Sequence, residues 1–120
     1  MLKIGLAIAI LPNPSDAISN PYLPCFLTAD WIEENLVDTG GDIHCSDTVL
    51  ISLENTMNGN IYPFHELLAI KKLAQKKNLS MHLDGARLWN ATAATNIEMR
   101  QFGQIFDTIS LCLSKGNKEF

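Results

Sequence analysis

The sequence lacks the features of several large classes of protein. No stretch approaches the roughly 20 apolar residues that a membrane-spanning helix needs. Charged residues make up 18% of the 120 residues, the net charge is −4, and no basic run exceeds a lysine pair, which argues against a nucleic-acid surface. The three cysteines show no CxxC spacing, so neither a disulfide framework nor a zinc site is indicated. We expect a cytoplasmic protein with no metal, membrane or nucleic-acid partner.

The first 26 residues show no regular pattern. An apolar run near the start carries one positive charge but precedes no small-x-small cleavage site. We favour a buried strand or an artefact of the chain start over a signal peptide there. Extended loop is expected where prolines interrupt the segment, at Pro12, Pro14, Pro21 and Pro24.

Beyond residue 26, short apolar runs alternate with helical patterns. Strands are expected at 48–53, 79–83 and 108–113, and helices at 29–37, 63–77, 86–94 and 98–105. Thr28 suits the N-cap of the first helix, and Trp89 and Phe102 are expected in the core. The inner stripe of the helix over 63–77 is expected to contain Leu67, Ile70, Leu73 and Ala74. This alternation predicts an α/β fold with a mainly parallel sheet flanked by helices.

Polar side chains follow each expected strand. Glu54 and Asn55 follow the first, residues 84–87 the second, and Ser114 and Lys115 the third. The carboxyl ends of parallel strands share one edge, where ligands bind in such sheets. A pyridoxal 5'-phosphate enzyme needs an amine for the cofactor aldehyde, a carboxylate for the ring nitrogen and a guanidinium for the substrate carboxylate. The residues at this edge include one of each.

Each of these three groups, and each histidine considered for the site, has a simpler interpretation when it is taken alone. Asp84 suits the N-cap of the following helix, and Lys115 suits a solvated strand end. Arg87 suits a surface ion pair with Asp84, which stabilises little. His44 alone is most simply a loop histidine, and His82 a hydrogen-bonded structural one. The ordered combination, rather than any single residue, favours the cofactor site.

Three ordered motifs resemble the low-specificity threonine aldolases. They are Leu53-Glu-Asn-Thr56 followed by Asn58-Gly59, then His82-Leu-Asp-Gly-Ala-Arg87, then Leu111-Cys-Leu-Ser-Lys-Gly116. That family belongs to the aromatic amino acid β-eliminating lyase and threonine aldolase group of fold-type I pyridoxal phosphate enzymes. The resemblance implies that residues 27–116 are part of the large, cofactor-binding domain. Residues 1–26 would be a poorly matching extension or loop, and 117–120 a divergent tail.

The resemblance also implies roles for single residues. Lys115 would form the imine with pyridoxal 5'-phosphate, Asp84 would keep its ring nitrogen protonated, and Ser114 would lie near its phosphate. Arg87 would contact both the cofactor and the substrate carboxylate. His44 would face the substrate hydroxyl, and it or a water that it orients would act as the base. The implied reaction is retro-aldol cleavage of threonine or allo-threonine to glycine and acetaldehyde, a step of threonine catabolism and glycine biosynthesis.

Several parts of the family pattern are missing from this sequence. Met57 stands where the family often has a histidine. The N-terminal Gly/Thr loop that binds the cofactor phosphate, the ring-stacking histidine and the C-terminal small domain are not present. We therefore expect a fragment that is inactive on its own, and we do not carry over the family's homo-oligomeric assembly. A non-catalytic α/β interaction domain or remnant, and another fold-type I amino acid lyase, remain the alternatives.

Overall fold

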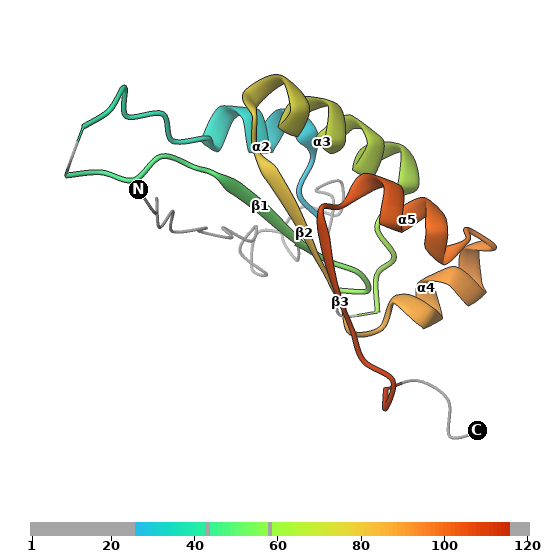
Figure 1. Ribbon diagram of the computed structural model, residues 1–120. Coiled ribbons are helices and arrows are strands. Elements are labelled where there is room, and N and C mark those ends of the chain that lie inside the picture. The colour runs from blue at the N-terminus through green and yellow to red at the C-terminus, as the bar shows by residue number, and fades with distance from the viewer. Residues whose placement is uncertain (1–25, 43, 58, 116–120) are drawn as a thin grey trace, which may run out of the picture.

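The computed structural model of the chain contains a three-stranded parallel sheet with helices packed against it (Figure 1). It describes residues 26–42, 44–57 and 59–115. The strands lie in sequence order, and are β1 (Leu50–Glu54), β2 (Ser80–Gly85) and β3 (Thr108–Leu111). The helices are α2 (Ala29–Asn35), α3 (Phe64–Lys77), α4 (Leu88–Thr95) and α5 (Met99–Ile105). The predicted α/β fold with parallel strands is confirmed.

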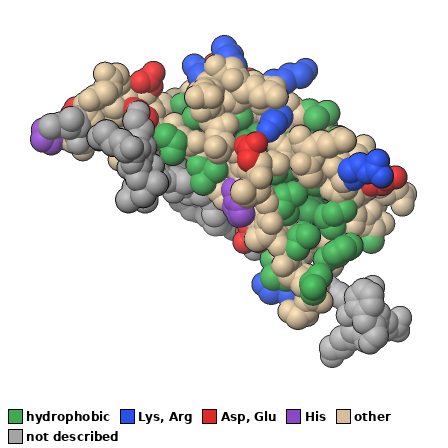
Figure 2. Space-filling model, viewed as in Figure 1, with side chains coloured by type: hydrophobic (Ala, Val, Ile, Leu, Met, Phe, Trp, Pro, Cys, Tyr) green, Lys and Arg blue, Asp and Glu red, His purple; other side chains and the backbone are tan. Residues whose placement is uncertain are grey.

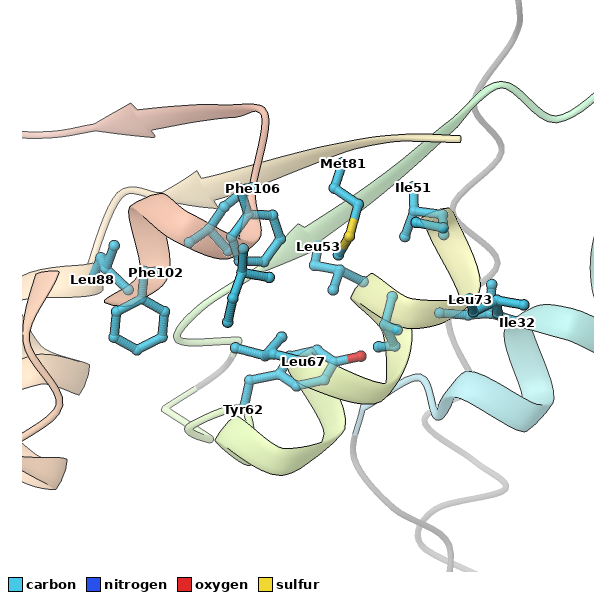
Figure 3. Close-up of a cluster of buried hydrophobic side chains, with 14 of the residues drawn as sticks. Ile32, Ile51, Leu53, Tyr62, Leu67, Leu73, Met81, Leu88, Phe102 and Phe106 are labelled. Atoms are coloured by element: carbon cyan, nitrogen blue, oxygen red, sulfur yellow. The ribbon is translucent and has the colours of Figure 1, made fainter. Parts of the chain in front are cut away.

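The helices α2, α3 and α5 lie on the same face of the sheet, and α4 follows the carboxyl end of β2 (Figure 1). The hydrophobic core fills the space between these helices and the strands (Figure 3). Its largest fully buried apolar side chains are Phe102, Leu67, Ile70, Met81, Leu83 and Leu88. The predicted inner stripe of α3 is confirmed, because Leu67, Ile70, Leu73 and Ala74 are all buried.

Local signals fix the ends of the helices. The Thr28 Oγ1 atom accepts a hydrogen bond from the Trp31 backbone N–H at 3.2 Å, which confirms Thr28 as the N-cap of α2. At the start of the same helix, the Ala29 N–H donates to Glu66 Oε1 at 2.7 Å and so joins α2 to α3. Asn78 ends α3 in the left-handed conformation, with φ at 55°, which asparagine adopts more readily than most residues.

The opposite face of the sheet is polar. Alternate residues of a strand point to opposite faces, so the strand positions between the buried apolar ones share this second face. These residues are Leu50, Ser52, Glu54, Ser80, His82, Asp84, Thr108 and Ser110, and all of them except Leu50 are polar. Among the residues that the structure describes, no helix covers them (Figure 1). Parallel sheets are usually buried and apolar on both faces. A polar face on such a sheet therefore indicates a surface for binding rather than one packed in the core.

Two expectations about buried residues have different outcomes. Phe102 is buried in the core as predicted, and its ring meets that of Phe64 edge-on at 5.7 Å. Trp89 is 46% exposed, so its predicted place in the core was wrong. In α4 the buried side is set by Leu88 and Ala91, and Trp89 lies outside this three-residue spacing. The third strand ends at Leu111, two residues earlier than expected.

The expectations for the first 25 residues, including the apolar run near the start, lie outside the described part of the chain. Within the described part, no helix is both long enough and apolar enough to cross a membrane.

Candidate functional site at the carboxyl edge of the sheet

The strand register brings three polar residues into one row on the polar face. Glu54 of β1 pairs with Asp84 of β2, and Asp84 pairs with Ser110 of β3. One step earlier in the register, His82 pairs with Thr108, and the His82 Nδ1 atom lies 2.8 Å from the Thr108 hydroxyl oxygen. The half-buried His82 therefore has a hydrogen-bond partner, in agreement with a structural histidine. The row at Asp84 marks the carboxyl edge at which the candidate site lies.

Asp84 is an exposed residue near the end of β2. Its Oδ1 atom accepts a hydrogen bond from the Ala86 N–H at 3.0 Å and lies 3.5 Å from the Ser110 hydroxyl oxygen. The interpretation of Asp84 as the helix N-cap was wrong, because Arg87 occupies that position in α4. Among the described residues, Arg87 forms no ion pair with Asp84. The carboxylate and the guanidinium are therefore not neutralised by each other.

Gly85 allows β2 and β3 to approach closely beside Asp84. A Cβ atom at this position would lie 2.8 Å from the Ser110 carbonyl oxygen and 3.2 Å from the Leu88 side chain. Such a backbone contact is closer than real Cβ atoms tolerate, so only glycine fits without a shift of the strands. The Asp84-Gly85 pair thus places a carboxylate directly beside the neighbouring strand.

A small cavity of about 220 Å³ opens next to Asp84, and this volume is below that of most ligand pockets. Its walls include two carboxylates, Glu54 and Asp84, together with the side chains of Met57 and Tyr62. Burial, followed by the charge of Glu66, raises the pKa of the Tyr62 hydroxyl, which remains protonated and donates to the Leu27 carbonyl oxygen. Sequence reasoning did not name Glu54 or Tyr62 as site residues.

Ser114 and Lys115 follow β3 and are both exposed. Lys115 borders an open groove of about 1170 Å³ beside α4, together with Trp89 and the 83% exposed Leu113. Asp84 does not line this groove but lines the smaller cavity. The carboxylate near the end of β2 and the amine after β3 therefore lie at the same edge of the sheet, but they border two different hollows.

His44 lies away from the other predicted site residues. It belongs to the loop between α2 and β1, which Figure 1 shows beyond the amino end of the strands, far from the segment that follows β3. There it is exposed, and its backbone N–H donates to Asp42 Oδ1 at 2.9 Å. The structure brings together Asp84 and Ser110, with Arg87 and Lys115 at the same edge, but does not bring His44 to them.

Four lysines of the described residues belong to α3 rather than to the candidate site, and basic side chains gather at the upper margin of the molecule in Figure 2. Lys71 pairs with Asp107 at 3.5 Å, and Lys76 and Lys77 both pair with Glu33, at 3.1 and 3.7 Å. These lysines therefore have acidic partners on the helix-covered side. Among the described residues, Lys115 and Arg87 take part in no ion pair and are available to an anionic ligand.

Comparison with known proteins agrees with the motifs at this edge. A family model described as beta-eliminating lyase matches residues 9–118, a range that begins within the first 26 residues. The chain is 46% identical over 114 residues to the low specificity L-threonine aldolase of Saccharomyces cerevisiae, covering 92% of this chain and 28% of that protein. The low specificity L-threonine aldolase of Escherichia coli is 38% identical over 108 residues, with 90% and 31% covered.

A relative with a different name also matches. The alanine racemase TOXG of Cochliobolus carbonum is 35% identical over 104 residues, with 84% of this chain and 26% of that protein covered. The chain thus spans less than a third of the length of each of these relatives. Because the family model matches most of the sequence, the chain belongs to the beta-eliminating lyase family.

Proposed function

We propose that this chain supplies one wall of a pyridoxal 5'-phosphate site in a lyase of the threonine aldolase type. The substrate would be threonine or allo-threonine, and the products glycine and acetaldehyde. The observation that carries the proposal is the position of Asp84, an exposed carboxylate beside the strand that leads to Lys115. The names of the Saccharomyces cerevisiae and Escherichia coli relatives support the same reaction.

The chemistry of the side chains at this edge fits the cofactor. Asp84 Oδ1 has protein partners, whereas Oδ2 has none among the described residues and is free to accept from a ring N–H. Glu54 lies in register with Asp84 and adds negative charge, which favours a protonated ring nitrogen. Exposed Lys115 and Arg87 offer an amine and a guanidinium without competing ion pairs in the described part of the chain.

Each residue would have a distinct task. Asp84 would hold the proton on the ring nitrogen through Oδ2, and Lys115 would hold the cofactor aldehyde through Nζ. Arg87 would bind the substrate carboxylate in two-point contact and fix the orientation of the α-carbon bonds. Ser114, which precedes Lys115, would offer its hydroxyl to the phosphate. When bound, the cofactor supplies an electron-withdrawing ring that stabilises negative charge on the α-carbon.

The base that removes the proton of the substrate hydroxyl is not assigned to His44 in this proposal, because its loop lies at the amino edge (Figure 1). Position 57 does line the cavity beside Asp84, but there it is a methionine. A thioether does not exchange protons at neutral pH. We therefore expect the groups of this chain to bind and orient the cofactor more effectively than they cleave the substrate.

Racemisation of a small amino acid is the second candidate function, because one relative is named an alanine racemase. Both reactions need Asp84 and Lys115, and they differ in which bond at the α-carbon is broken. Incubation of the chain and the cofactor with threonine and with alanine separates them, since acetaldehyde forms only in the first reaction.

Titration of the purified chain with pyridoxal 5'-phosphate tests the proposed site. We expect a saturable absorption change that is lost in Lys115→Arg and weakened about tenfold or more in Asp84→Asn, which removes a charged hydrogen-bond partner. Lys72→Arg is the matched control, because Lys72 is an exposed α3 lysine outside the candidate site. Equal absorption changes in the wild type and Lys115→Arg would refute the proposal.

We also propose a reducing compartment, such as the cytoplasm, as the place of action. Cys45 and Cys112 are free thiols in the structure. Free thiols persist where glutathione and thioredoxin keep them reduced.

A further inference from the structure

Two hydroxyl groups of β3 contact two titratable side chains of β2 on the polar face. The Thr108 hydroxyl oxygen lies 2.8 Å from His82 Nδ1, and the Ser110 hydroxyl oxygen lies 3.5 Å from Asp84 Oδ1. The contacts are successive because the parallel register pairs His82 with Thr108 and Asp84 with Ser110. The proposed function assigns no task to either hydroxyl.

The two oxygens of the Asp84 carboxylate have different surroundings. Oδ1 receives the Ala86 N–H at 3.0 Å and faces the Ser110 hydroxyl, while Oδ2 has no partner among the described residues. The separation of 3.5 Å is at the long end of the range for a hydroxyl donor. Within the described residues Ser110 has no other side-chain hydrogen bond, so its hydroxyl is free to turn toward Oδ1.

The backbone keeps Ser110 in place for this contact. At Gly85, the residue after Asp84, the Ser110 carbonyl oxygen approaches so closely that a Cβ atom would lie 2.8 Å from it. The close approach of the strands therefore fixes the β3 backbone at Ser110 relative to β2, so that the Ser110 Cβ atom stays beside Asp84. A group held by the backbone orients its partner at a lower entropic cost than a long, mobile side chain does.

We infer that Ser110 is a positioning residue for Asp84. By donating to Oδ1 it holds the carboxylate in one orientation, in which Oδ2 points away from β3 and accepts from the protonated ring nitrogen of the ligand. This inference rests on the proposed function for the identity of the ligand. The orientation of the carboxylate itself is a property of the chain without any ligand.

The first test measures that orientation in the cofactor-free chain. Three-bond NMR couplings to the Asp84 β protons report the χ1 rotamers of its side chain, which set where the carboxylate lies relative to β3. We expect one dominant rotamer in the wild type, averaging in Ser110→Ala, and restoration in Ser110→Thr, which keeps the hydroxyl. Thr108→Val is the matched control, because it removes the hydroxyl that contacts His82 and leaves the Asp84 contact intact. Unchanged couplings in Ser110→Ala would overturn the inference.

The second test links the orientation to the ligand. We expect Ser110→Ala to weaken pyridoxal 5'-phosphate binding about threefold to tenfold, the usual effect of one lost hydrogen bond. The same substitution in an Asp84→Ala background is expected to have no effect, because its partner is then absent. An equal loss in both backgrounds would contradict the positioning role. A third outcome separates the two claims. If the wild type binds no cofactor but Ser110→Ala still averages the Asp84 couplings, the positioning of Asp84 is supported and the proposed function is refuted.

Discussion

The two faces of the sheet differ in nearly every respect. On the helix-covered face, Ile51, Leu53 and Met81 point toward the helices (Figure 3), and Leu83 is buried as well. On the polar face, the same strands present hydroxyls, carboxylates and an imidazole that the described helices leave open. Strand residues alternate between the two faces. Within one strand, therefore, every second residue packs in the core and stabilises the fold, and the residues between them carry the polar groups of the candidate site. Substitutions on the two faces should therefore have separable effects.

The largest expected effect is on the covered face. Phe102→Ala removes a buried ring that packs edge-on against Phe64, and such truncations cost about 3–5 kcal/mol of unfolding free energy. Urea unfolding followed by circular dichroism measures this loss. Asp84→Asn on the polar face is the control, and we expect it to change stability by less than about 0.5 kcal/mol. Comparable losses for the two variants would show that the faces are not separable.

A smaller loss is expected on the covered face at the carboxyl end of β2. Gly85→Ala places a Cβ atom 2.8 Å from the Ser110 carbonyl oxygen, so β3 must shift, at a cost of about 1–3 kcal/mol. Gly103→Ala is the matched control, because a Cβ atom at this α5 position meets nothing within 4 Å. Alanine also has a higher helix propensity than glycine, so we expect the unfolding free energy of the control to rise by about 0.5–1 kcal/mol. Thermal unfolding measures the melting temperatures of both variants. Equal melting temperatures would contradict the close approach of β3 to Gly85.

The smallest effect is a dependence of stability on pH at the amino edge. The Met81 N–H donates to Asp107 Oδ2 at 2.7 Å. This bond, together with Lys71, lowers the pKa of the Asp107 carboxyl below its usual range, against an opposing effect of desolvation. A lowered folded-state pKa gives stability that is present above the unfolded pKa and is lost as the pH falls through the folded one.

Urea unfolding midpoints between pH 7 and pH 2 measure this dependence. We expect the midpoint of the wild type to fall at the acid end more steeply than that of Asp107→Asn. Lys76 and Lys77 also lower the pKa of Glu33. Because Glu33 is present in both the wild type and Asp107→Asn, its contribution cancels when the two curves are compared. Parallel curves would show that Asp107 contributes nothing through its charge.

Local patterns were sufficient to predict most of the fold. The apolar spacing predicted the inner side of α3, and the short side-chain hydroxyl of Thr28 predicted the start of α2. Trp89 was misplaced because α4 has only eight residues and buries Leu88 and Ala91 instead. In a helix of only eight residues, the amino-acid composition does not predict which side of the helix is buried.

The site was less predictable than the fold because it depends on pairing between strands. Asp84 was placed correctly at a strand end, but the contact with Ser110 follows from a register that no local pattern specifies. The position of His44 could have been inferred from topology, since a residue before a parallel strand lies at the amino edge. Glu54 was recognised at a strand end, but its alignment with Asp84 required the structure.

The proposed site depends above all on Lys115 as the amine that holds the cofactor at the carboxyl edge. Borohydride reduction of the chain with pyridoxal 5'-phosphate, followed by peptide mapping, shows which lysine carries the cofactor. The predicted result is a label concentrated on Lys115 and reduced in Asp84→Asn, with little label on Lys71, Lys72, Lys76 or Lys77 of α3. A label spread evenly over these lysines and Lys115, and unaffected by Asp84→Asn, would contradict the claim.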